Sequence, residues 1–205
     1  MSCRAGLQVG MRWAEARATK GSRLLIVGAS STLQWSSAGE TPLRVADVND
    51  IEAIARLINA AFRIEDFFID GDRIDMEKVR DMFGKGKFLL AEDAARIPRC
   101  LAGCVYVEVR GERGYLGLLS VEPPKQRAGL GRRLAIAAED HLRAAGCCAV
   151  DLAIVSLRPE LLPFYRRLGY AETGTAPFPA EKHTKLPCHF ITMSKALEDK
   201  SEIRS

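Results

Sequence analysis

The feature that most constrains this 205-residue chain is a glycine-rich stretch, QRAGLGRRL (residues 126–134), that follows a strand-like apolar run. The segment RRLAIAAEDHLRAAG (132–146) then has the composition of a strong helix and ends in a glycine suited to the position after a helix. A glycine inside a helical pattern costs about 1 kcal/mol relative to alanine. We therefore expect Gly129 and Gly131 to serve the turn between the strand and the helix, where a close approach to the backbone is useful.

Such a turn is suited to binding an anion. The first N–H groups of a helix have no partner within the helix, and the helix dipole places a partial positive charge there. Glycines have no Cβ and so let phosphate oxygens approach the backbone. The residues expected to direct their amides at a phosphate or pyrophosphate are Gln126, Arg127, Ala128, Gly129, Leu130 and Gly131, with Lys125, Arg127, Arg132 and Arg133 supplying positive charge around it. The P-loop pattern and the dinucleotide fingerprint GxGxxG are both absent, which leaves the less specific pattern Q-x-x-G-x-G.

Hydrophobic periodicity predicts a single mixed domain over residues 41–197. The expected strands are 41–48, 87–93, 100–111, 113–121, 149–156 and 189–197, with a possible extra strand near 170–175, and the expected helices are 49–62, 73–86, 132–146 and 159–169. Asn49 and Glu52 resemble a capping box at the start of the first helix. Short gaps between strands favour hairpins, so the predicted class is α+β, a mixed α/β fold with a largely antiparallel sheet.

Residues 1–40 differ in texture from the rest of the chain. They hold five basic residues against two acidic ones, together with serine clusters and one short strand-like run, RLLIVGAS. We interpret them as a poorly ordered N-terminal extension, with an organellar transit peptide as the alternative, and the order of residues does not match a secretory signal. Residues 198–205 are predicted to be a C-terminal tail.

Composition excludes some classes of partner. The longest apolar runs are far shorter than the roughly 20 residues of a membrane helix, so no membrane partner is expected. A net charge of +4 is too mild to indicate nucleic acid without a basic stripe. The six cysteines form neither a CxxC pair nor a zinc pattern, so we expect no metal, a reducing compartment and a cytoplasmic protein. We expect Cys104 to be a buried thiol. If the protein forms an oligomer, a homodimer is the expected assembly.

Three motifs in order resemble the GNAT superfamily of acyl-CoA-dependent N-acyltransferases. These are a strand ending in V-x-P (121–123), the Q-x-x-G-x-G turn (126–131) and the helix end F-Y-x-x-L-G-Y (164–170). The resemblance covers residues 41–197 in element order. It implies a central sheet in which one parallel pair of strands is splayed apart, helices on both faces, and acetyl-CoA as co-substrate in the gap.

The resemblance also implies roles for particular residues. The strand before the turn would offer backbone groups to the pantetheine arm and the acyl carbonyl, and the turn would hold the pyrophosphate. Tyr165 would be a general acid that protonates the departing thiolate, which suits a phenol with a reference pKa near 10. An ordinary core tyrosine beside Phe164 is the alternative. The implied cofactor-binding residues are Leu119, Ser120, Val121, Gln126, Arg127, Ala128, Gly129, Leu130, Gly131, Arg132 and Arg158.

Arg158 departs from the family pattern, and the resemblance does not identify the base. Many members carry asparagine seven residues before the tyrosine, where this chain has Arg158, and a guanidinium has no acceptor. Arg158 could contact an anionic substrate, contact a cofactor phosphate, or face solvent. The base that deprotonates the amine is also undefined, with Glu108, Glu112, Glu122 and His189 as candidates and Glu122 beside the cofactor strand.

The predicted activity is acetyl transfer from acetyl-CoA to a primary amine of a small molecule or peptide, by direct attack in a ternary complex. Substrate choice would come from the first two helices and the loop at 175–189, which contains Phe178 and several basic residues. The alternative is a catalytically inactive acyl-CoA-binding regulatory module. A nucleotide hydrolase is disfavoured because the P-loop lysine is missing.

Overall fold

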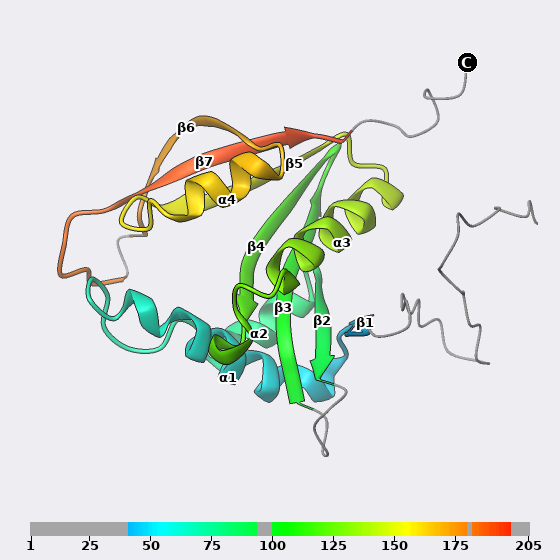
Figure 1. The fold of residues 1–205 in the computed structure, drawn as a ribbon, viewed down its shortest axis with the longest axis horizontal. Helices are drawn as coiled ribbons and strands as arrows, with labels where there is room; N and C mark the ends of the chain where they lie inside the picture. The colour runs from blue at the N-terminus through cyan, green and yellow to red at the C-terminus, as the bar shows by residue number, and fades with distance from the viewer. Residues whose placement is uncertain (1–40, 94–99, 180–181, 198–205) are drawn as a thin grey trace, which may run out of the picture.

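The computed structural model describes residues 41–93, 100–179 and 182–197, which form one seven-stranded sheet with helices on both faces (Figure 1). The strands are β1 (Leu43–Val45), β2 (Lys87–Asp93), β3 (Cys100–Arg110), β4 (Arg113–Val121), β5 (Ala149–Val155), β6 (Ala171–Pro177) and β7 (His189–Ala196). The α-helices are α1 (Ile51–Phe62), α2 (Met76–Phe83), α3 (Leu130–Ala144) and α4 (Leu161–Arg167), with 3-10 turns η1 (Val48–Asp50), η2 (Arg63–Glu65) and η3 (Pro123–Lys125). The predicted extension 1–40, with its strand-like run, and the tail 198–205 lie outside the described residues, so those boundaries stay predictions.

The sheet has one parallel pair of neighbours, and that pair separates. The strand order is β1-β2-β3-β4-β5-β7-β6, and every neighbouring pair is antiparallel except β4 with β5. Those two strands are in register only from Arg113 opposite Ala149 to Tyr115 opposite Asp151. Figure 1 shows them starting side by side and then diverging. The expected mostly antiparallel sheet with a splayed parallel pair is confirmed.

An ion pair fastens the closed end of this pair of strands. The Arg113 guanidinium binds the Asp151 carboxylate on β5 and donates to Ser194 Oγ on β7 at 2.7 Å. The hydrogen bonds from Arg113 are the main reason that the pKa of Asp151 is lowered. One side chain of β4 thus joins three strands where the two halves of the sheet still touch.

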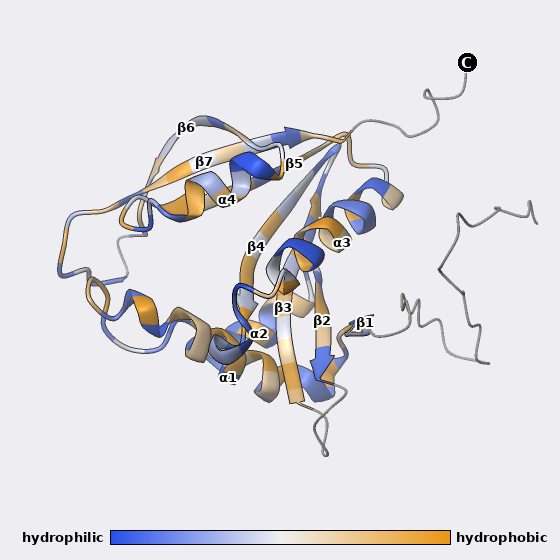
Figure 2. Ribbon diagram, in the orientation of Figure 1, coloured by the Kyte–Doolittle hydropathy of each residue, from blue (hydrophilic) through white to orange (hydrophobic). Residues whose placement is uncertain are grey.

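Both faces of the sheet are covered, because alternate residues of a strand point to opposite sides. On β3, Val105 and Val107 belong to the core under α3, whereas Cys104 and Tyr106 belong to the core under α1 and α2. Figure 2 shows the orange apolar segments gathered on the strands and on the helix sides that meet them. Cys104 is fully buried, as expected, and burial raises the pKa of its thiol to about 12.

The predicted capping box is wrong by two residues. Asp47, not Asn49, caps the chain before α1: its carboxylate accepts from the Asn49 N–H at 2.8 Å, and Asp50 accepts from the Asp47 N–H at 2.8 Å. Arg44 on β1 binds the Asp50 carboxylate at 2.6 Å. This ion pair favours Asp50 over Glu52 as the reciprocal partner, and it places the 3-10 turn η1 before α1.

Candidate active site

A cavity of about 600 Å³ lies where β4 and β5 separate. Its walls come from the end of α1 and η2, the second half of β4, the glycine turn, the start of α3, β5 and α4. Its lining residues are Ala61, Phe62, Glu65, Arg73, Tyr115, Leu116, Gly117, Leu118, Leu119, Val121, Gln126, Arg127, Gly129, Gly131, Arg132, Leu152, Ala153, Ile154, Val155, Arg158, Leu161, Phe164, Tyr165, Arg167 and Phe190. The groove expected beside the strand is therefore present.

The glycine turn presents an uncapped helix start to this cavity. Gly129 is the N-cap of α3, has a φ of 84°, and has no side-chain cap among the described residues. A Cβ built on Gly129 would meet no atom within 4 Å, so this glycine is required by its backbone conformation and not by crowding. Gln126 Nε2 donates to the Val121 carbonyl at 3.1 Å and thereby ties the turn to the end of β4. The Gln126 N–H, expected to face the anion, instead donates to the Pro123 carbonyl at 3.3 Å. The amides that follow it, the helix dipole and the cavity-lining Arg127 and Arg132 together suit an anion.

The end of β4 carries a bulge that turns backbone groups toward the cavity. Its register with β3 shifts between Gly117 and Ser120, and Leu118 has a φ of 50°. Such a conformation costs a non-glycine residue of the order of 1–3 kcal/mol and is typical of functional sites. Ser120 Oγ donates to the Leu118 carbonyl at 3.1 Å, which supports the bulge from within the core. Leu119 and Val121 line the cavity on either side of Ser120.

The structure brings most of the predicted cofactor residues together. Those that line the cavity are Leu119, Val121, Gln126, Arg127, Gly129, Gly131, Arg132 and Arg158, and those that do not are Ser120, Ala128 and Leu130. Ser120 and Leu130 are buried, with exposed fractions of 1% and 7%, and Ala128 is exposed. Sequence reasoning identified the segment but could not tell which of its side chains face inward.

Tyr165 lies in the cavity wall on α4, next to the ring of Phe164 at a centroid distance of 5.0 Å. Burial raises its pKa, followed by a smaller effect of Tyr115, so the phenol is protonated at neutral pH. The N–H groups of Leu168 and Tyr170 donate to the Tyr165 carbonyl at 3.0 and 3.1 Å and hold the end of this short helix. Tyr165 is thus a buried proton donor facing the space between the separated strands.

The bases considered from sequence all lie outside the cavity lining. Glu122 follows β4 and its N–H donates to the Ala102 carbonyl at 2.9 Å, but its side chain is not among the lining residues. Glu108 binds Arg110 at 2.9 Å, and this contact is the main cause of its lowered pKa. Glu112 is in a turn, and His189 is an exposed residue at the start of β7. None of these side chains reaches the space beside Tyr165.

Sequence reasoning missed a buried acid in the opposite wall. Glu65, at the end of η2, is 3% exposed and lines the cavity. Its carboxylate lies 3.2 Å from Arg158 Nη1 and 3.7 Å from Arg73 Nη1. Burial raises the pKa of Glu65, and the two guanidinium groups oppose that rise only in part. Arg158, the departure from the family pattern, is therefore a partner of Glu65, and it also binds Glu160.

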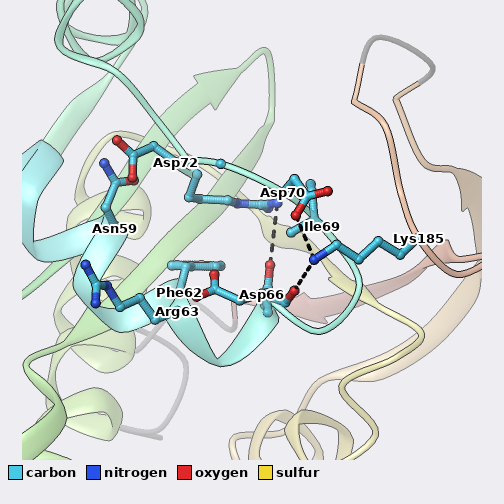
Figure 3. Close-up of a pocket in the computed structure, with 11 residues that line it drawn as sticks. Asn59, Phe62, Arg63, Asp66, Ile69, Asp70, Asp72 and Lys185 are labelled. Atoms are coloured by element: carbon cyan, nitrogen blue, oxygen red, sulfur yellow. Dashed lines mark hydrogen bonds and ion pairs between the residues drawn. The ribbon is translucent and has the colours of Figure 1, made fainter.

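A second cavity of about 310 Å³ adjoins the first (Figure 3). The two share the lining residues Phe62, Glu65 and Arg73. Lys185, from the loop before β7, crosses to this cavity, where its Nζ donates to the Asp66 carbonyl at 2.8 Å and pairs with Asp70 at 2.7 Å. The 175–189 loop thus contributes Lys185 to this cavity, and its role as a wall of the acceptor pocket stays a prediction. Phe178 does not line the second cavity but packs against Phe68.

No group of three or more His, Cys, Asp or Glu side chains in the described part of the chain is arranged to hold a metal ion. Among the helices that the structure describes, none is long and apolar enough to cross a membrane.

The chain is similar to several known acetyltransferases. Over 138 residues the chain is 28% identical to the IAA acetyltransferase of Azospirillum brasilense, covering 67% of this chain and 84% of that protein. It is 30% identical over 129 residues to the mycothiol acetyltransferase of Saccharopolyspora erythraea, covering 62% of this chain but only 42% of that protein's length. The solved structure of an aminoglycoside 6'-N-acetyltransferase complexed with coenzyme A matches with a TM-score of 0.61 at 20% identity, covering 77% and 98% of the two chains.

The model of the acetyltransferase (GNAT) family matches residues 51–170, from α1 to the end of the α4 segment. That range contains the separated strands, the glycine turn and Tyr165. The chain belongs to the GNAT acetyltransferase family.

Proposed function

We propose that this protein is an N-acetyltransferase that transfers the acetyl group of acetyl-CoA to a primary amine by direct attack in a ternary complex. The observation that carries the proposal is the cavity between β4 and β5, which combines an uncapped helix start at one end with a buried phenol in its wall. Family membership supports acetyl-CoA as the co-substrate. The free thiols of Cys147 and Cys148 fit a reducing compartment, and we propose the cytoplasm.

The cavity fits coenzyme A in its chemistry. The amides from Arg127 to Gly131 would hold the pyrophosphate, with the Arg127 and Arg132 side chains neutralising its charge. Backbone groups of Leu119 and Val121, which the bulge leaves facing the gap, would bind the amide-bearing arm. Acetyl-CoA supplies an activated acyl thioester, and the chain supplies orientation and proton transfer.

Tyr165 would donate a proton to the sulfur as the thiolate leaves. Its raised pKa keeps the proton on the phenol until that moment, and general acid catalysis of this kind contributes about 10²–10⁴-fold to a rate. Backbone N–H groups near the reacting carbonyl would stabilise the negative charge that develops on its oxygen. The amine would enter from the side of Phe62, Glu65 and Arg73, where the second cavity opens.

A thiol-release assay tests this proposal. The purified chain is incubated with acetyl-CoA and a panel of amines comprising n-butylamine, glucosamine, kanamycin and a tripeptide with a free N-terminus. Release of CoA thiol that depends on one of these amines, with mass-spectrometric detection of the acetylated product, is the expected result. Tight CoA binding without turnover of any amine would instead favour the inactive acyl-CoA-binding module.

A further inference from the structure

Glu65 stands out among the buried charged groups because it lines both cavities at the point where they meet. It lies at the end of η2 and is 3% exposed, so little of its side chain meets water. The other buried acids, Asp93 and Glu139, belong to neither cavity lining. A carboxylate is costly to bury, and its position at this junction calls for an explanation.

One oxygen of Glu65 is left without a hydrogen bond. Arg158 Nη1 donates to Oε1 at 3.2 Å, whereas Oε2 has no hydrogen-bond donor among the described residues, its nearest charged atom being Arg73 Nη1 at 3.7 Å. A buried acceptor without a donor costs about 1–3 kcal/mol, and more when it is charged. An ammonium group, with three N–H donors and no acceptor, would satisfy this oxygen.

We propose that Glu65 binds the acceptor amine as its ammonium ion and takes the proton that must be removed before attack. This inference rests on the proposed acetyl transfer. Glu65 is placed to act from the wall opposite the glycine turn, in the same cavity as Tyr165. The surrounding Arg73 and Arg158 keep the carboxylate ionised enough to receive the ammonium.

The proton and bond balance is complete with these two side chains. The ammonium gives one proton to the Glu65 carboxylate and becomes a neutral amine with a free electron pair. Its nitrogen forms a bond to the thioester carbon and the carbon–sulfur bond breaks. Tyr165 gives its proton to the thiolate and is reprotonated by the second proton that the nitrogen loses, so the products are an amide, a CoA thiol and one proton, which Glu65 releases to solvent.

The electrostatic surroundings of Glu65 suit a base. Burial is the largest influence and raises its pKa; Arg73 and Arg158 lower it, and Glu160 raises it. Lys182, which donates to the Arg73 carbonyl at 3.0 Å, also interacts with Glu65 through its charge, and Arg63, Asp66, Asp70 and Asp72 line the second cavity with it. A base whose pKa is moved toward neutrality accepts a proton more readily than an exposed glutamate does.

Kinetics with matched variants test the assignment. With acetyl-CoA and the best amine of the panel, Glu65→Gln is expected to lower kcat/KM by about 10²–10⁴-fold. It should also remove the low-pH limb of the pH profile, which is the fall in kcat/KM as Glu65 becomes protonated. Glu65→Asp keeps a carboxylate and should recover part of the rate and the limb. The control is Glu160→Gln, which also removes a carboxylate bound to Arg158 but lies outside the cavity lining, and it should change kcat/KM by less than about fivefold.

A second measurement does not depend on turnover. In protein labelled with ¹³C-glutamate and saturated with CoA, the Glu65 side-chain carboxyl signal is identified by its absence in Glu65→Gln. We expect n-butylammonium to shift this signal and n-butanol at the same concentration to leave it unchanged. If neither compound moves it, the ammonium site is refuted.

The outcomes separate this inference from the proposed function. If an amine is acetylated but Glu65→Gln retains both the rate and the low-pH limb, Glu65 is not the base and acetyl transfer stands. If no amine is acetylated but the carboxyl signal responds to n-butylammonium, the ammonium site stands and the transferase proposal fails.

Discussion

The two ends of the large cavity are built in different ways. At one end, the glycine turn and the start of α3 offer backbone N–H groups from one continuous stretch, residues 127–131. At the other end, Glu65, Arg73 and Arg158 meet as side chains, and 93 positions separate Glu65 from Arg158 in the sequence. A ligand group that is the same for every reaction suits a backbone site, whereas a variable acceptor suits side chains that can be exchanged.

The largest effect is expected between the two ends, at Tyr165. Tyr165→Phe removes the proton donor for the thiolate and should lower kcat by about 10²–10⁴-fold, while the Kd for CoA measured by calorimetry stays unchanged. Tyr170→Phe is the matched control, since its ring lies 5.7 Å from that of Tyr165 but does not line the cavity. An unchanged kcat in Tyr165→Phe would remove the phenol from the mechanism.

The next largest effect is expected at the end of the cavity formed by the backbone N–H groups of the glycine turn. Gly129→Val places a branched side chain at a φ of 84° beside the proposed pyrophosphate site, and should weaken CoA binding at least tenfold, or about 1.4 kcal/mol. Gly146→Val carries the same backbone strain, with a φ of 88° and open space around it, at the far end of α3. Both variants should lose about 1–3 kcal/mol of stability, and only the first should lose CoA affinity. Equal affinities in the two folded variants would contradict the placement of the pyrophosphate.

A smaller effect is expected at the end of the cavity where the side chains of Glu65, Arg73 and Arg158 meet. Arg158 lowers the pKa of Glu65 through its charge and its hydrogen bond, so Arg158→Gln should raise that pKa. Because Glu65 must be ionised to accept a proton, the fall in kcat/KM at low pH should move to higher pH. The measurement is the pH profile of acetylation with one amine at saturating acetyl-CoA. A limb that stays in place would show that another group controls it.

The smallest effect concerns stability. The folded pKa of Glu65 is raised, so its ionised form weakens the fold as pH rises from the unfolded value, near 4.3, through the folded value. Glu65→Gln should therefore unfold at a temperature at least as high as the wild type at pH 8, and this advantage should vanish at pH 4. Each 1 kcal/mol corresponds to roughly 2–4 °C for a chain of this size. A clear loss of thermal stability at pH 8 would mean that Glu65 serves the fold.

The backbone end could be predicted from sequence because its signal is local. Strand, glycine turn and helix follow one another within residues 116–146, and each has a periodicity or composition of its own. Tyr165 was predicted from the resemblance of its motif, F-Y-x-x-L-G-Y, to the family. The local signal covers residues 116–146 only. It did not distinguish Gly129, which lines the cavity, from Leu130, which packs into the core, because that depends on how α3 is rotated against the sheet.

No pattern in the sequence predicts that Glu65, Arg73 and Arg158 meet at the other end of the cavity. Glu65 lies in an ordinary mixture of polar and apolar residues after a helix, and only the folded chain brings it to Arg158. The capping box illustrates the same limit on a smaller scale: Asp47 and Asp50 form it, and Asp50 is also bound by Arg44 from β1, a contact that exists only in the folded chain.

The separation of β4 from β5 also affects how firmly the two halves of the sheet are held together. Among the described residues, no strand pairing beyond Tyr115 and Asp151 joins the four strands on one side to the three on the other. The Arg113 contacts with Asp151 and Ser194 lie at the closed edge. A molecule bound in the gap would therefore act as a wedge that also braces the two halves. Backbone amide exchange in β5 and β7 should slow when CoA is added, even at amides that it does not touch.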